Sequence, residues 1–157
     1  MPNHLQFCTF YLEGLLFGVE LIGVQEVINQ LDLTQVPLAP AVVEGLINLR
    51  GQIVTAVDLR RRLELAPRAI GVSFMNIVVA TNDGAVSLLV DEIGDVVEVE
   101  DSTFEPPPGT MRGNVRDVIV GVHKLQNRLM HVLDIEKACR MIDTPTSSGT
   151  EMQSAGS

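Results

Sequence analysis

Aromatic residues and cysteines are scarce in this 157-residue chain, which has no tryptophan, one tyrosine, five phenylalanines and two cysteines. Cys8 and Cys139 cannot form a disulfide framework, and neither lies near a second thiol as in a zinc or redox motif. The few aromatic rings leave little on which nucleic-acid bases could stack. The sequence therefore excludes a disulfide-stapled domain and argues against a base-stacking surface.

Positive charge is also scarce, because 20 acidic residues outnumber 11 basic ones and give a net charge of −9. This balance argues against a protein that grips phosphate backbones. No apolar run is long enough to span a membrane, and the first six residues lack the pattern of a secretory signal. We therefore expect a cytoplasmic protein with no nucleic-acid partner and no direct membrane insertion.

Hydrophobic residues make up 46% of the chain and occur mainly as short runs of Val, Ile and Leu. Residues 7–12 and 15–21 are two such runs, and the turn signal Glu13-Gly14 between them predicts a β-hairpin. Further strand-length runs, rich in β-branched residues, occupy residues 52–57, 76–80, 86–90, 96–99, 118–122 and 129–133. The chain is predicted to be mainly β.

Helical signals are few. Residues 59–65 follow Asp58 and residues 135–141 follow Asp134, and each aspartate is a plausible N-cap for a short helix. Residues 142–157 contain little to bury and are predicted to form a disordered C-terminal tail. The remainder, residues 1–141, is expected to be a single domain.

Two segments of the chain align without a gap, residues 45–59 and residues 121–135. In this alignment Gly45 matches Gly121 and Asp58 matches Asp134, with apolar positions in step between them. Upstream, residues 19–23 resemble residues 90–94, so the order hairpin, acidic bend, strand, hairpin and capped helix occurs twice. Short Val-rich strands can resemble one another by chance. The recurring order nevertheless favours two similar small β-units packed together.

Reactive groups in a catalytic arrangement are not evident. His123 and His131 lie on neighbouring predicted strands, but no third metal ligand follows with a recognisable spacing. Asp91, Glu92 and Asp95 lack the spacing of a calcium-binding loop, so a solvated face is the simpler interpretation. We therefore expect no enzyme activity, no cofactor and no metal. A regulatory hydrolase that uses the two histidines is retained as an alternative.

Charges of opposite sign are concentrated in separate parts of the chain. Arginine, which outnumbers lysine nine to two, is favoured in protein interfaces because its planar guanidinium holds carboxylates well. Two charged faces on one small body suit an adaptor that contacts several proteins. The basic residues of this pattern are Arg50, Arg60, Arg61, Arg62 and Arg68, and the acidic ones are Asp91, Glu92, Asp95, Glu98, Glu100, Asp101 and Glu105.

An ordered set of motifs resembles the CheW-like coupling domains of bacterial chemotaxis over about residues 6–140. The most specific element is Asn-Leu-Arg-Gly at residues 48–51, followed by Val-Asp-Leu-Arg at residues 57–60. The other elements are Val-Gln-Glu-Val at 24–27, prolines at 37 and 40, Leu-Val-Asp at 89–91, Asp-Val at 95–96 and three prolines at 106–108.

The resemblance implies a fold of two five-stranded, SH3-like β-barrels around a shared apolar core. It implies a non-catalytic scaffold that couples methyl-accepting receptor signalling tips to the regulatory domain of the histidine autokinase CheA. Other CheW copies in array rings are further implied partners. Two alternatives stay open, namely a paralogue that serves another output such as twitching pili, and a β-barrel module that binds a small molecule or oligonucleotide.

Carried onto matching positions, the resemblance implies partner contacts at Val24, Glu26, Gly45, Arg50 and Val96. The residues themselves also allow internal roles. Arg50 could form an ion pair with Glu26 or Asp58 that merely orders its loop, and Gly45 could serve only the backbone. Val24 and Val96 could be ordinary core residues, or exposed apolar residues of a groove for a helical receptor tip.

Overall fold

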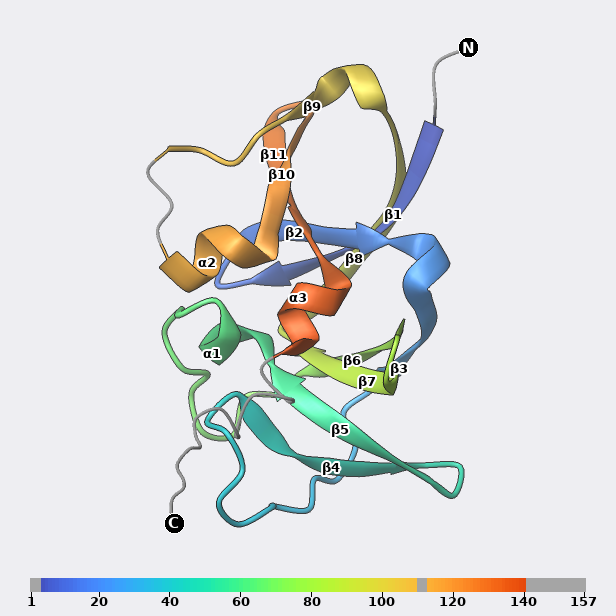
Figure 1. Cartoon of the computed structure of the whole chain (residues 1–157), viewed down its shortest axis with the longest axis vertical. Helices are drawn as coiled ribbons and strands as arrows, with labels where there is room; N and C mark the ends of the chain where they lie inside the picture. The colour runs from blue at the N-terminus through green and yellow to red at the C-terminus, as the bar shows by residue number, and fades with distance from the viewer. Residues whose placement is uncertain (1–3, 110–112, 141–157) are drawn as a thin grey trace, which may run out of the picture.

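The strands of the chain form two sheets that lie one above the other, with short helices between them (Figure 1). The computed structural model describes residues 4–109 and 113–140, so the tail predicted over residues 142–157 lies outside the described residues. In spatial order, sheet A contains β8 (Glu92–Glu100), β1 (His4–Leu12), β2 (Leu15–Glu20), β11 (Arg128–Leu133), β10 (Ile119–Leu125) and β9 (Phe104–Glu105). Sheet B contains β3 (Val24–Asn29), β6 (Met75–Thr81), β7 (Gly84–Val90), β5 (Gln52–Asp58) and β4 (Val43–Leu49).

The helices are short, as the sequence predicts. They are α1 (Leu59–Arg62), α2 (Gly113–Val118) and α3 (Ile135–Cys139), with two 3-10 turns, η1 (Leu21–Gly23) and η2 (Asp101–Thr103). None of the helices in the described ranges has the length and apolar character needed to cross a bilayer. The mainly β prediction is confirmed, with two additions that the sequence did not suggest, namely α2 and the two-residue β9.

Local signals explain where the elements begin and turn. The Asp58 side chain accepts a hydrogen bond from the backbone N–H of Arg60 at 3.0 Å, and Asp134 accepts one from Lys137 at 3.0 Å, so both predicted caps are confirmed. The β1–β2 turn places Glu13 at φ 52° and Gly14 at φ 80°. Two successive positive φ values are typical of the tight turn that matches the twist of a hairpin.

The internal repeat is confirmed by the strand register. Gly45 lies opposite Ala56 and Gly121 lies opposite Val132, and each glycine follows an irregularity in its own strand pair. Both repeats then end in an aspartate-capped helix. The parallel pairs also correspond, because β5 pairs with β7 in sheet B and β11 pairs with β2 in sheet A. The two halves of the chain therefore build the same arrangement of strands.

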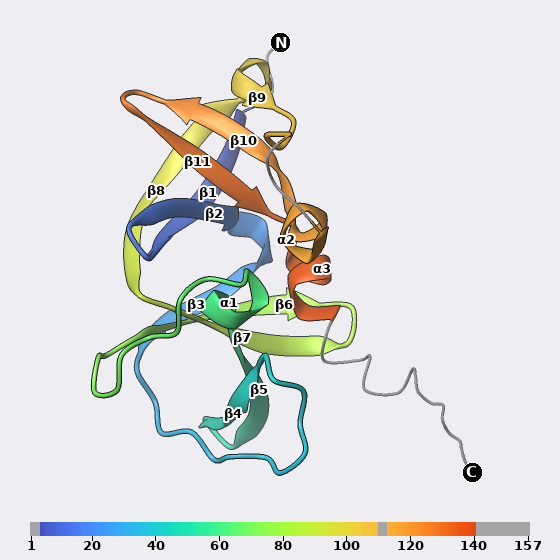
Figure 2. The same ribbon diagram turned by 90° about the vertical axis from the view of Figure 1, so that its left-hand side faces the viewer.

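The two sequence repeats nevertheless do not coincide with the two sheets. β3 follows β2 along the chain but leaves sheet A and pairs with β6, while β8 follows β7 but leaves sheet B and pairs with β1. Figure 2 shows β8 rising beside β1 and β3 lying beside β6. Each sheet therefore takes one hairpin from one repeat and its remaining strands from the other.

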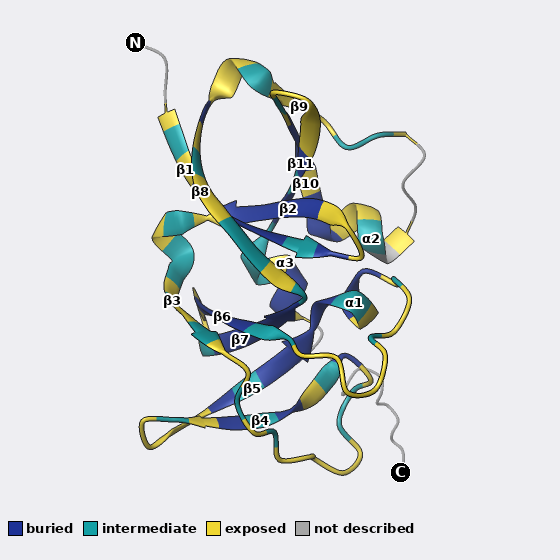
Figure 3. Cartoon of the chain, turned by 180° about the vertical axis from the view of Figure 1, so that it is seen from behind, coloured by how far each residue is buried: buried dark blue, intermediate teal, exposed yellow. Residues whose placement is uncertain are grey.

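The main hydrophobic core lies between the sheets and draws on both (Figure 3). Phe10, Leu12 and Phe17 enter it from sheet A, and Ile77 and Leu88 enter it from sheet B. Each sheet also has one smaller hydrophobic cluster of its own. A core shared by both sheets is what the family resemblance implied, and it joins the two lobes into one packed body.

Candidate protein-docking surface

Arg50 and Glu26 form a bidentate ion pair that links the two ends of sheet B. The guanidinium donates from Nη1 to Glu26 Oε2 at 2.5 Å and from Nη2 to Oε1 at 2.6 Å. Glu26 lies on β3 and Arg50 lies in the turn between β4 and β5, so the pair joins the two edges of the sheet. Of the two partners that the sequence left open, Glu26 is confirmed, while Asp58 instead caps α1 and lies 3.7 Å from Arg61.

The ion pair holds the arginine in place without hiding it. The Arg50 side chain is 71% exposed, whereas that of Glu26 is 24% exposed. The hydrogen bonds from Arg50 lower the pKa of Glu26, and the same contact raises the pKa of Arg50. A guanidinium has five N–H donors, so most of them stay available to a partner's carboxylate or carbonyl oxygen.

Gly45 lies beneath a loop and not on the surface. It is buried, and a Cβ atom added there would lie 2.6 Å from the backbone oxygen of Thr34. Thr34 and Leu46 exchange two backbone hydrogen bonds, of 2.9 and 2.8 Å, at this crossing. Glycine is therefore required here because the loop that leads into β4 passes directly over its Cα. The structure gives Gly45 this internal role, and a partner contact at Gly45 stays a prediction.

Val24 lies on β3 and Val96 lies on β8. We call β3 and β8 the crossing strands, because each one follows a strand of one sheet along the chain but pairs in the other sheet. Val24 opens β3, is half-buried and packs against the shared core, whereas Val96 in β8 is 53% exposed. Val96 lies opposite the buried Cys8, at the margin of the core. In Figures 2 and 3 both crossing strands lie on the same side of the molecule. Val96 is thus not an ordinary core residue, while Val24 contacts the core and is also reached by solvent.

The two histidines do not converge on one site. His123 is buried, its Nδ1 lies 2.7 Å from the Thr103 hydroxyl, and its ring lies between Phe7 and Phe104. Burial lowers the pKa of His123. His131 Nδ1 lies 3.0 Å from the carbonyl oxygen of Leu16. The two residues are out of register on β10 and β11 and point to opposite faces, so the arrangement favours structural roles for both.

The sequence agrees with a family model described as a CheW-like domain over residues 6–143. The chain belongs to the CheW-like family. Similar proteins include the chemotaxis protein CheW of Thermotoga maritima, which is 33% identical and covers 86% of this chain and 87% of its own length. The chemotaxis protein CheW of Treponema pallidum is 30% identical and covers 86% of this chain and 82% of its own length.

Solved structures agree with this assignment. The scaffolding protein TtCheW from Thermoanaerobacter tengcongensis superposes with a TM-score of 0.78 at 26% identity, covering 88% of this chain and 92% of that one. The family resemblance and the fold inferred from the sequence are therefore confirmed. With this family assignment, the chain is a CheW-like scaffold protein of bacterial chemotaxis.

Most of the basic stretch of this CheW-like chain serves the fold. Arg60 donates to Asp91 from Nε at 2.9 Å and from Nη2 at 2.6 Å, and Arg68 Nη2 lies 3.3 Å from the same carboxylate. Arg62 is 8% exposed. Asp91 is therefore a partly buried ion-pair centre and not part of the solvated face expected for the acidic segment. Within the basic stretch, Arg50 and Arg61 are the arginines whose side chains are more than half exposed.

Two exposed aliphatic residues that lie close in sequence to Glu26 and Arg50 were not identified from the sequence of this CheW-like chain. Val27 follows Glu26 on β3 and is 38% exposed, and Ile53 lies just beyond the Arg50 turn and is 62% exposed. Alternation along a strand separates two faces without saying which one points outward. In the structure Ile53 lies opposite Asn48, a polar residue on the neighbouring strand. Aligning the two strands of this hairpin in the sequence could have indicated that Ile53 shares the exposed face of Asn48.

Proposed function

We propose that this chain is a non-enzymatic adaptor that couples the signalling tips of methyl-accepting chemoreceptors to the regulatory domain of the kinase CheA. It works in the cytoplasm at membrane-bound receptor arrays, where further CheW copies are neighbours. Family membership supports this function. The observation that carries the site is Arg50, an exposed guanidinium held in one orientation by Glu26.

The surface around Arg50 combines the features of a protein contact. Arginine is enriched where protein surfaces associate, and Arg50 is followed three positions along the chain by Ile53, an aliphatic residue that is 62% exposed. The bidentate pair holds the guanidinium before a partner arrives, which lowers the entropy lost on binding. Val24 and Val96, on the crossing strands, supply apolar contacts for a helical receptor tip. Modest contacts of this kind become stable in an array because many act together.

A charge-swap experiment separates partner binding from loop ordering at Arg50. Arg50→Glu is expected to lose binding to one partner, and the double variant Glu26→Arg/Arg50→Glu restores an ion pair with reversed polarity. If Arg50 touches the partner, the double variant stays defective, because the guanidinium now projects from β3. Binding is measured by pulldown with a CheA regulatory domain and a receptor signalling fragment, and thermal unfolding checks the fold. Full recovery in the double variant would show that the pair only orders the loop.

A second variant tests the crossing strands. Val96→Asp is expected to abolish binding to one partner while the fold is retained, because the side chain is already 53% exposed. Leu129→Asp is the matched control, since Leu129 is a 42% exposed aliphatic residue on the β10–β11 hairpin. Equal binding of both partners by Val96→Asp and the unchanged chain would overturn the assignment of Val96.

A further inference from the structure

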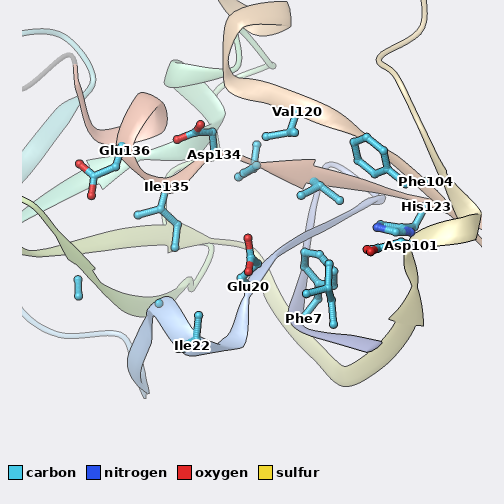
Figure 4. A pocket seen from close by; sticks show the side chains of 15 residues that line it. Phe7, Glu20, Ile22, Asp101, Phe104, Val120, His123, Asp134, Ile135 and Glu136 are labelled. Atoms are coloured by element: carbon cyan, nitrogen blue, oxygen red, sulfur yellow. The ribbon is translucent and has the colours of Figure 1, made fainter. Parts of the chain in front are cut away.

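A groove of about 610 Å³ lies on another part of the surface, between sheet A and α3 (Figure 4). Its lining is mostly apolar and includes Phe7, Ile22, Phe104, Val120 and Ile135. In Figure 4 it runs from Phe104 and His123 at one end to Glu136 at the other. None of the five residues assigned above to partner contacts lines this groove.

Three large apolar side chains on the groove are open to solvent. Ile22 is 93% exposed, Val120 is 46% exposed and Phe104 is 40% exposed. Single exposed apolar residues are common, but a contiguous group around a depression marks a binding surface. The η1 turn that carries Ile22 packs against α3, because a Cβ atom at Gly23 would lie 2.6 Å from Cδ1 of Ile135. The groove is therefore formed by packed elements before any partner binds.

The charges on the groove have one sign. Four carboxylates line it, and no lysine or arginine among the described residues does. Asp134 and Glu136 have fixed positions, since they accept backbone hydrogen bonds from Lys137 at 3.0 Å and from Asn82 at 2.9 Å. Fixed carboxylates beside an apolar surface attract a cation more strongly than the same groups in open water. The other two carboxylates are Glu20 and Asp101.

We propose that this groove docks a basic amphipathic helix of a partner protein. The aliphatic face of the helix covers Ile22, Val120 and Phe104, and its lysines or arginines meet the carboxylates along the groove. A helix fits better than an added strand, because the edge strand at this groove, β9, has two residues and offers little backbone pairing. The residues that line the groove do not include Arg50 or Glu26, so the proposed contact uses other side chains than the ion pair.

Binding of a designed helix tests the proposal on the full chain. The probe is a fluorescent Leu/Lys helix of about four turns, and the comparison peptide has the same pattern with Glu in place of Lys. Titration at roughly 0.15 M salt suppresses long-range attraction to the net negative charge. The fluorescence of the Leu/Lys helix is expected to change to a plateau as the full chain is added, which indicates saturable binding. The Leu/Glu helix is expected to show no such binding.

Variants locate the binding. Glu20→Lys/Glu136→Lys is expected to weaken the Leu/Lys helix by about tenfold, and Ile22→Ser by about threefold. Glu44→Lys/Glu98→Lys changes the net charge equally and should have little effect. Glu98 lies opposite Gln6, so it points away from the face that carries Leu5 and Phe7. Ile22→Ser changes no charge and alters an exposed position, so it tests the groove even where the double variant fails to fold.

Several results would overturn the proposal. Equal losses in the groove and control variants would mean that only net charge is sensed, and no saturable binding would mean that the groove takes no basic helix. A short aliphatic amine that binds in a groove-dependent way while the helix does not would assign the groove to small cations. Self-association abolished by the groove variants would assign it to a second copy of the chain.

Discussion

At the scale of single residues, the turn that carries Arg50 shows how backbone and side chain act together. Arg50 has φ 53° and Gly51 has φ 85°, so the β4–β5 connection is a tight hairpin turn of the type found at β1–β2. Arginine is uncommon in this backbone region, where glycine and asparagine are preferred. The Glu26 carboxylate supports it there, and Asn48 accepts a 2.8 Å hydrogen bond from the Gly51 N–H.

Gly45 allows a sharp test of a steric requirement. Gly45→Ala is expected to lower the free energy of unfolding by about 1–3 kcal/mol, because the new methyl group must displace the Thr34 backbone and not a flexible side chain. Gly109→Ala is the matched control, since a Cβ atom there meets nothing within 4 Å. Urea unfolding measures both. Equal stability of the two variants would show that the loop moves aside at no cost.

At the scale of elements, Asp91 ties together three connections that are distant in the sequence. Its carboxylate accepts hydrogen bonds from Arg60 and Arg68, and also from the backbone N–H of Glu13 in the β1–β2 turn at 2.8 Å. Glu13 in turn accepts a 3.0 Å hydrogen bond from the N–H of Ala66. The link therefore joins the turn of sheet A to the chain that leads from α1 to β6 in sheet B.

The pH dependence of stability tests this link. Burial would raise the pKa of Asp91, but the hydrogen bonds from Arg60 and from the Glu13 amide outweigh it and lower the pKa below its ordinary 3.8. A lowered pKa in the folded chain contributes stability that is present above about pH 4 and is lost as the pH falls through the lowered value. Asp91→Asn is expected to cost about 2 kcal/mol at pH 7 and to flatten the loss of stability in acid.

The control for Asp91 is a surface pair. Glu105→Gln removes a 2.8 Å contact with Lys124 whose two side chains are 49% and 62% exposed, so its effect should stay below about 1 kcal/mol. Denaturant titrations between pH 3 and pH 7 compare the two variants. Parallel pH profiles for Asp91→Asn and the unchanged chain would show that Asp91 contributes nothing to the acid sensitivity.

Local elements could be predicted from the sequence because their signals are local. Turn residues such as Glu13-Gly14 and caps such as Asp58 act within four residues, so their sequence is sufficient. The charge run at residues 60–62 was less informative, because a run of arginines usually means solvent exposure. Here Arg60 pairs with a carboxylate 31 positions away and Arg62 is buried. Contacts over such distances leave no periodic trace in the sequence.

At the scale of the whole molecule, the exchange of crossing strands makes the two lobes dependent on each other. Repeats found by alignment suggested two similar units, but not that β3 and β8 pair with hairpins of the opposite half. Strand partners are chosen by packing across the shared core and not by neighbouring residues, so the sequence could not predict this exchange. The position of Arg50 depends on this exchange. Its partner Glu26 lies on β3, and β3 belongs to sheet B only because it pairs with β6.

Cutting the chain between the repeats tests that dependence. A break after Gly71, in the exposed connection between α1 and β6, leaves fragment 1–71 with the β1–β2 and β4–β5 hairpins, while β3 loses β6. Fragment 72–157 keeps the β6–β7 and β10–β11 hairpins, while β8 loses β1. Isolated hairpins are marginal in water, so we expect each fragment alone to be unfolded by circular dichroism.

Mixing the two fragments should restore the folded structure, since every lost pairing is then available and the shared core can form. Recovery is read from a cooperative thermal transition that depends on fragment concentration, as expected when folding and association are linked. Mixing with a Leu88→Asp version of fragment 72–157 is the control, because Leu88 is fully buried in the core between the sheets. A cooperative transition in either fragment alone would show that one lobe is stable without strands from the other, and the interdependence inferred from the exchange would be wrong.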